Sequence, residues 1–102
     1  MSYPLDTTFI TKVNDFINSL PPDDQKKFAL AITSLSEGDF QAVYIKQIKG
    51  EIKELRIKKY RLMFFIHKNT IYFANVFLKK SNKTPTKETE FAEKYYKLIT
   101  NN

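Results

Sequence analysis

Residues 52–78 read IKELRIKKYRLMFFIHKNTIYFANVFL, three apolar or alternating segments joined by two short polar turns. The segments are residues 52–57, 60–67 and 70–78. The turns are Lys58-Lys59 and Lys68-Asn69, and polar pairs between such runs are typical of hairpins. Residues 43–46 add a fourth segment, which also alternates apolar and polar residues as a half-buried strand does. The sequence therefore predicts an antiparallel meander of four strands.

Two helices are predicted before the strands. Apolar residues recur at helical spacing from Thr8 to Leu20, and Thr7 or Thr8 is available as the cap. Consecutive prolines end this helix, and two aspartates then suit the first turn of a second helix, which Gly38 ends. The pattern predicts a helical hairpin.

A third helix is predicted after the strands. It starts at Thr84-Pro85, where threonine is the cap and proline takes the first helical position. Phe91, Tyr95 and Leu98 are expected to form its buried stripe. The order helix, helix, four strands, helix predicts an α+β fold with the helices around one sheet.

Composition narrows the possible functions. The chain has 102 residues, and 17 Lys and Arg against 11 Asp and Glu give a net charge of +6, which favours polyanionic partners. Cysteine is absent and there is one histidine, so we expect no disulfide, no metal and no cofactor. The start has no signal-peptide pattern, and no stretch is apolar enough for a membrane span. We expect one domain over residues 1–102, cytoplasmic and without membrane contact.

Short turns also predict which side chains share a face of the sheet. A two-residue turn at Lys58-Lys59 places Arg56 opposite Arg61, and the next turn places Arg61 opposite Val76. One face is then a continuous apolar surface for the first two helices: Val43, Ile45, Leu55, Ile57, Leu62, Phe64, Ile66, Ile71, Phe73 and Phe77. The other face is apolar at one end, under the C-terminal helix, with Met63, Phe65, Tyr72, Ala74 and Val76. Its other end is basic and open, with Tyr44, Lys46, Glu54, Arg56, Arg61 and Lys80.

Two arginines directly opposite each other on neighbouring strands repel. A bound anion would resolve the repulsion. Alternatively, Arg56 pairs with Glu54 or with the C-terminal helix, and Arg61 is simply solvated. The residues alone favour the two interpretations about equally.

Three segments carry a resemblance to a known family. They are residues 48–56 (IKGEIKELR), the pair Tyr60-Arg61 before an apolar strand, and residues 77–92 (FLKKSNKTPTKETEFA). In this order and spacing they resemble the RelE superfamily of toxins, and within it the phage-derived HigB-like branch. Members usually open with a strand, whereas this chain offers only Tyr3-Pro4-Leu5 at that place.

The resemblance implies a toxin that cleaves messenger RNA in the ribosomal A site. It also implies a small antitoxin, often with a helix-turn-helix, and contact with operator DNA only through the toxin–antitoxin complex. Metal-free RNA cleavage needs a group that takes the proton of the 2′-hydroxyl, cationic donors for the charge on the phosphate, and an acid for the departing 5′-oxygen.

The basic face supplies candidates for these roles. Arg56 and Arg61 are the candidate phosphate ligands, because a guanidinium gives two parallel hydrogen bonds, and Lys80 is the third catalytic candidate. Glu54 is a possible base, although pairing with Lys46 across the strands is its more ordinary role. The candidate RNA-binding residues are Lys46, Lys79, Lys83 and Tyr44. His67 is set aside because it lies beside the far hairpin turn, and Tyr60 because it falls on the core side.

Two other functions remain open from the sequence. Similar toxins of the ParE type act without catalysis by binding DNA gyrase. An inactivated member would only bind its antitoxin or operator DNA, and the basic face would then be a binding surface.

Overall fold

The computed structural model describes residues 4–101, which form three helices, one short 3-10 helix and a five-stranded sheet. In chain order the elements are β1 (Asp6–Phe9), α1 (Thr11–Asn18), α2 (Pro22–Ser36), η1 (Phe40–Ala42), β2 (Tyr44–Lys49), β3 (Ile52–Ile57), β4 (Tyr60–His67), β5 (Thr70–Leu78) and α3 (Thr86–Thr100). The strand order is β1-β5-β4-β3-β2, so the predicted meander occupies four consecutive places in the sheet. The α+β class is confirmed.

The fifth strand, β1, was not predicted. It pairs in parallel with the first half of β5, and the ring of Phe9 stacks on Phe73 with centroids 4.8 Å apart. Helix α1 consequently begins at Thr11, and the expected helical start at Thr8 is wrong because that residue belongs to the strand. The chain thus has an opening strand, and it begins after Tyr3-Pro4-Leu5, the tripeptide considered for that place. Tyr3 lies outside the described residues.

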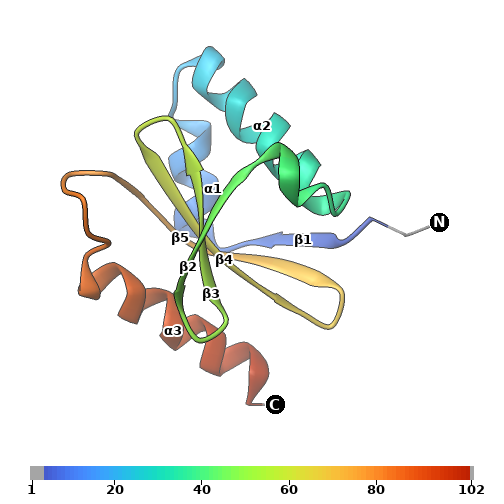
Figure 1. The fold of residues 1–102 in the computed structure, drawn as a ribbon, viewed down its shortest axis with the longest axis vertical. Helices are drawn as coiled ribbons and strands as arrows, with labels where there is room; N and C mark the ends of the chain where they lie inside the picture. The colour runs from blue at the N-terminus through green and yellow to red at the C-terminus, as the bar shows by residue number, and fades with distance from the viewer. Residues whose placement is uncertain (1–3, 102) are drawn as a thin grey trace.

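Each face of the sheet carries its own apolar core. Helices α1 and α2 cover one face and α3 covers the other, as Figure 1 shows. The buried residues of the first core are Val13, Phe28, Leu35, Leu55, Ile57, Tyr60, Leu62, Phe64, Ile71, Phe73 and Val76. Those of the second are Ile52, Met63, Phe65, Ala74, Phe77 and Ala92.

The predicted register is confirmed at both hairpin turns and fails farther along β5. Arg61 lies opposite Phe77, not Val76, because the pairing of β4 and β5 shifts just before Phe64 and leaves Ala74 as an extra residue. An extra residue in one strand reverses the facing of everything beyond it. Val76 therefore packs in the first core and Phe77 on the other face, the reverse of the prediction.

Helix α3 differs from the prediction in its buried side and in its start. Phe91 and Leu98 are 43% and 69% exposed, and the helix packs on the sheet through Ala92, Tyr95, Tyr96 and Ile99 instead. The helix also starts one residue later than predicted. Its first residue is Thr86, and Pro85 is the N-cap residue, with no side-chain capping bond. The expected cap, Thr84, lies outside the helix and directs its hydroxyl elsewhere. Within residues 4–101, no helix is both long enough and apolar enough to cross a membrane.

Candidate functional site

Four side chains form one row across β2, β3, β4 and β5, on the face of the sheet that also carries α3. Tyr44 on β2 lies opposite Arg56 on β3, which lies opposite Arg61 on β4, which lies opposite Phe77 on β5. Directly opposite residues point to the same face, so two cations stand between two aromatic rings. This row is the base of the candidate site.

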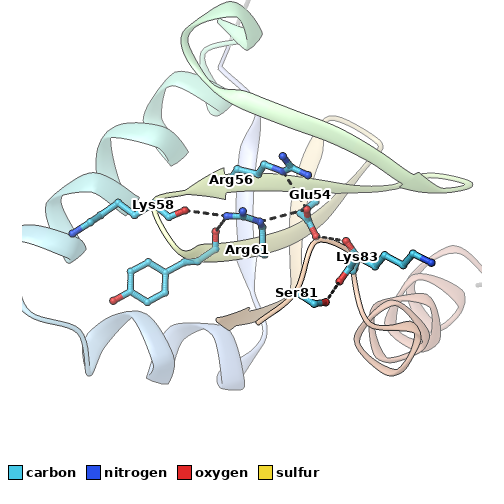
Figure 2. A network of polar contacts seen from close by, with 8 residues as sticks. Glu54, Arg56, Lys58, Arg61, Ser81 and Lys83 are labelled. Carbon is cyan, nitrogen blue, oxygen red and sulfur yellow. Dashed lines mark hydrogen bonds and ion pairs between the residues drawn. The ribbon is translucent and has the colours of Figure 1, made fainter. Parts of the chain in front are cut away.

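Glu54 lies between the two arginines. Its Oε1 atom is 3.5 Å from Nε of Arg56 and 3.7 Å from Nε of Arg61. Figure 2 shows both guanidinium groups directed at this one carboxylate. Their repulsion is thus relieved within the protein by a shared counter-ion, in agreement with the expectation that Arg56 pairs with Glu54.

Arg61 is buried, and the expectation that it is simply solvated is wrong. Only 7% of the residue is exposed. One terminal nitrogen, Nη1, donates to the carbonyl of Lys58 at 3.0 Å and to that of Tyr60 at 2.8 Å. The β3–β4 turn and Glu54 therefore hold this guanidinium from two sides, and the basic end of the face is less open than predicted.

Arg56 is the more accessible arginine. Its side chain is 28% exposed, and its guanidinium carbon lies 5.1 Å from the ring centroid of Tyr44, which is 63% exposed. The Nε atom is buried without a hydrogen-bond partner among the described residues. The terminal nitrogens are thus the part of Arg56 that can meet a ligand.

Glu54 itself is almost fully buried, with 1% of the residue exposed. Its second oxygen, Oε2, accepts a 2.8 Å hydrogen bond from the hydroxyl of Thr84. Lys46 is the cross-strand neighbour of Glu54, as predicted, but the described ion pairs of this carboxylate are those with the arginines. The network therefore joins β3 and β4 to the segment that enters α3.

Residues 79–85, here called the β5–α3 loop, close one side of the site. The amide of Lys79 donates to the carbonyl of Lys59 at 2.8 Å, and the hydroxyl of Ser81 donates to the carbonyl of Lys83 at 3.0 Å. In Figure 2 the Lys83 side chain points away from the arginines. A narrow pocket of about 10 Å³, room for about one water molecule, lies between loop and sheet. Its lining residues are Glu54, Arg56, Arg61, Phe77, Lys79, Lys80, Ser81, Asn82, Lys83, Thr84 and Pro85.

A second polar cluster supports the turn that holds Arg61. Asp24 on α2 accepts 2.6 Å hydrogen bonds from the ammonium of Lys58 and from the hydroxyl of Tyr60. The bonds from Lys58 and then Tyr60 lower the pKa of Asp24, and the bond to Asp24 raises the pKa of Tyr60. Helix α2 is thereby fixed to the turn whose carbonyls bind the guanidinium.

The structure thus brings together most of the residues selected from the sequence. Arg56, Arg61, Glu54, Lys79, Lys80 and Lys83 line one pocket, and Tyr44 and Lys46 flank Arg56 at the edge strand. His67 lies beside the far turn, and Tyr60 lies in the core, as expected. Within the described residues, no three side chains of the metal-ligating types His, Cys, Asp and Glu come together.

Five lining residues of the pocket were not selected as site residues from the sequence: Phe77, Ser81, Asn82, Thr84 and Pro85. Phe77 and Thr84 are the two whose side chains had been given another place. Phe77 was assigned to the opposite face because the bulge at Ala74 was not foreseen. Thr84 was assigned to a helix cap. Both lie within the quoted segment of residues 77–92, so membership of that segment is the signal that would have found them.

Comparison with known proteins is consistent with this geometry. Residues 15–97 match the family described as Phage derived protein Gp49-like (DUF891). The toxin–antitoxin complex RelBE2 from Mycobacterium tuberculosis contains a chain with 20% identity and a TM-score of 0.59, and the match covers 76% of this chain and 100% of that one. The RelB–RelE antitoxin–toxin complex from Methanococcus jannaschii contains a chain with 23% identity and a TM-score of 0.59. That match covers 76% of this chain and 98% of the other. No curated protein matches significantly. These likenesses show the RelE fold, and the family match covers most of the sequence, so the chain belongs to the Gp49-like family of phage-derived proteins.

Proposed function

We propose that this protein is the toxin of a type II toxin–antitoxin system and that it cleaves messenger RNA on the ribosome without a metal ion. The observation that carries the proposal is the pocket between the sheet and the β5–α3 loop. Its lining residues include five cationic side chains and a single carboxylate. Because the space inside the pocket is small, a polyanion with this charge complementarity would bind across its mouth, with a phosphate beside the accessible cations.

The two arginines have different parts in this proposal. Arg56 binds the phosphate directly, because its terminal nitrogens are the accessible ones and a planar guanidinium can give two parallel hydrogen bonds to phosphate oxygens. Arg61 has Nη1 bonded to two carbonyls and Nε directed at Glu54, which leaves Nη2 for the substrate. It contributes positive potential and holds Glu54 in place.

Cleavage needs two proton transfers besides phosphate binding. The 2′-oxygen bonds to phosphorus as a base takes the proton of the 2′-hydroxyl, and the bond from phosphorus to the 5′-oxygen breaks as an acid protonates that oxygen. Both oxygens of Glu54 already have partners, so this carboxylate suits the counter-ion role better than that of the base. We assign proton transfer to Lys80, which lines the same pocket as the arginines.

The remaining cations and the exposed tyrosine form the RNA-binding surface of the proposal. Lys46 and Tyr44 lie on the edge strand beside Arg56, and Lys79 and Lys83 lie on the loop. The ring of Tyr44 is exposed enough to stack on an unpaired base. Single-stranded RNA, with splayed bases and an accessible backbone, is the substrate that this combination fits.

A cognate antitoxin is the proposed protein partner. Both structural neighbours were solved as complexes of a toxin with its antitoxin. The antitoxin would hold this chain inactive and connect it to operator DNA. A reading frame beside the gene that encodes a short helix-turn-helix protein would support this part of the proposal.

The test is to incubate the purified protein with a defined mRNA, with and without programmed ribosomes, and to map the cut ends. Cuts that appear only with ribosomes are the expected result. Absence of cuts, together with inhibition of gyrase supercoiling, would replace the proposal with the ParE-type function. Absence of both activities, with antitoxin binding intact, would leave a binding protein only.

A further inference from the structure

The β5–α3 loop carries Lys79, Lys80 and Lys83 of the proposed site. One side-chain hydrogen bond attaches the end of the loop that precedes α3 to the sheet. We propose that Thr84 is a positioning residue: its hydroxyl, bound to Glu54, latches the loop so that Lys79 and Lys80 face the same RNA backbone as Arg56. This inference rests on the proposed function and deepens it, because it names what assembles the RNA site.

The β5–α3 loop is attached to the sheet near both of its ends. At its start, the amide of Lys79 donates to the carbonyl of Lys59. At its end, Thr84 donates to Oε2 of Glu54 at 2.8 Å. Residues 80–83 between these two points are exposed, and the described bond among them, from Ser81 to Lys83, is internal to the loop. The loop is thus a strap fixed at two points.

The acceptor of the Thr84 hydrogen bond is a buried carboxylate. Glu54 is 1% exposed, and the arginines already occupy its Oε1 atom. Loss of the Thr84 hydroxyl would leave Oε2 as a buried carboxylate oxygen without that donor, and hydrogen bonds to charged groups are the strong ones. The hydrogen bond that attaches the loop therefore uses the same carboxylate that pairs with the two arginines.

The chain around Thr84 keeps this residue outside α3. Pro85 follows Thr84, and the residue before a proline is held in an extended conformation. Helix α3 begins directly afterwards, at Thr86. Thr84 is consequently free of the helix and turned to the sheet, where its hydroxyl serves the network in place of capping α3.

Three variants separate a latch from a general stabilising role. Thr84→Val keeps the shape of the side chain and removes the hydroxyl, Thr84→Ser keeps the hydroxyl, and Thr86→Val makes the same change two residues on, at an exposed position. Limited trypsin digestion measures how accessible the loop is in the absence of RNA, because trypsin cleaves after lysine. Fragment masses identify which bonds are cut.

We expect Thr84→Val to speed cleavage after Lys79, Lys80 and Lys83 roughly tenfold, the change that loss of one hydrogen bond to a charged group would produce. Thr84→Ser and Thr86→Val should be cut at close to the wild-type rate. An unchanged rate in Thr84→Val, or faster cleavage at lysines throughout the chain, would overturn the latch in favour of no role or of a purely structural one.

A second measurement connects the latch to RNA. Binding of a short single-stranded RNA is titrated at several salt concentrations, and Thr84→Val should show a shallower salt dependence than Thr84→Ser, because two loop lysines no longer neutralise phosphates. Equal salt slopes in the two variants would contradict the positioning role. In the ribosome assay, kcat of Thr84→Val should fall roughly tenfold and recover in Thr84→Ser. If the wild type does not cut mRNA at all, the proposed function fails, whereas the digestion and the salt slopes still decide the latch.

Discussion

Arg56 and Arg61 stand directly opposite each other on β3 and β4, and their Nε atoms lie 3.5 and 3.7 Å from the same oxygen of Glu54. Like charges at opposite positions destabilise a sheet, and one carboxylate between them offsets the repulsion without cancelling the positive charge. The cluster retains an excess of one positive charge before the loop lysines are counted. Its two arginines differ in burial, and we expect them to differ in what their removal does.

Arg56→Ala should impair activity and Arg61→Ala should impair folding. Removal of Arg56, which is more accessible, is expected to change the free energy of unfolding by less than about 1 kcal/mol and to slow ribosome-dependent cleavage roughly 100-fold. Removal of Arg61, which is itself buried, takes a partner from Glu54 and also the donor from the carbonyls of Lys58 and Tyr60, and a cost of about 3 kcal/mol is expected. Urea unfolding and the cleavage assay measure the two effects.

The control for this pair is Lys26→Ala, which removes one exposed positive charge from α2. It should change neither measurement appreciably. Full activity in Arg56→Ala would refute the assignment of that residue to the phosphate. A variant Arg61→Ala as stable as the wild type would show that the bonds to Lys58 and Tyr60 contribute little.

The loop lysines should be visible in the salt dependence of RNA binding. Each phosphate neutralised on a single strand contributes about 0.7 to the slope of log K against log salt, so Lys79→Ala with Lys80→Ala should reduce the slope by about 1.4. The matched control removes two exposed lysines elsewhere, in Lys26→Ala with Lys94→Ala. Equal slopes in the two double variants would mean that the loop does not contact the RNA.

How much of the fold was predictable from sequence depends on how local each feature is. The two-residue turn at Lys58-Lys59 fixes its register, so Arg56 was correctly placed opposite Arg61. The bulge at Ala74 has no such signature, because alanine carries no turn or glycine signal and both residues that exchange faces, Val76 and Phe77, are apolar. The parallel pairing of β1 joins segments far apart in the chain, and four residues are too few for a distinctive pattern.

The sequence was enough to predict which residues of the candidate site share one face of the sheet. It was not enough to predict which of them form ion pairs or hydrogen bonds with one another. Alternation brought the charged side chains of β3 and β4 to one face. Nothing in the order of residues shows that Glu54 would be buried or that it would prefer two arginines to Lys46. Burial of that carboxylate depends on the loop folding back over the sheet, which is a tertiary contact made through Thr84.

Asp24 should give the protein a specific sensitivity to acid. Its hydrogen bonds with Lys58 and Tyr60 lower its pKa in the folded state from the ordinary value of 3.8. A lowered folded pKa contributes stability that is present above 3.8 and is lost as the pH falls through the folded value. Urea midpoints between pH 5 and about pH 2 should therefore fall more steeply for the wild type than for Asp24→Asn, which is less stable near neutrality.

Asp23→Asn is the matched control, since Asp23 lies in the same first turn of α2 and is exposed. It should keep the steep acid dependence of the wild type. Parallel curves for the wild type and Asp24→Asn would contradict the link between this carboxylate and the turn.

Asn75 should prove to be the polar residue that fastens α3 to the sheet. It is fully buried beside the bulge. Its Oδ1 atom accepts hydrogen bonds from the amide of Val76 at 2.9 Å and from the ammonium of Lys12 at 2.6 Å. Its Nδ2 atom donates to the carbonyl and to the carboxylate of Glu88, both at 3.0 Å. Asn75→Ala would leave a buried amide without its acceptor, with an expected cost of about 2 kcal/mol. Hydrogen exchange should accelerate in α3 before it does so in β4, because the lost bonds are those that hold the helix.

Asn14→Ala, at an exposed position of α1, should change stability by no more than about 0.5 kcal/mol. Uniform acceleration of exchange over the whole chain in Asn75→Ala would show instead that the residue stabilises the fold without fastening α3 in particular.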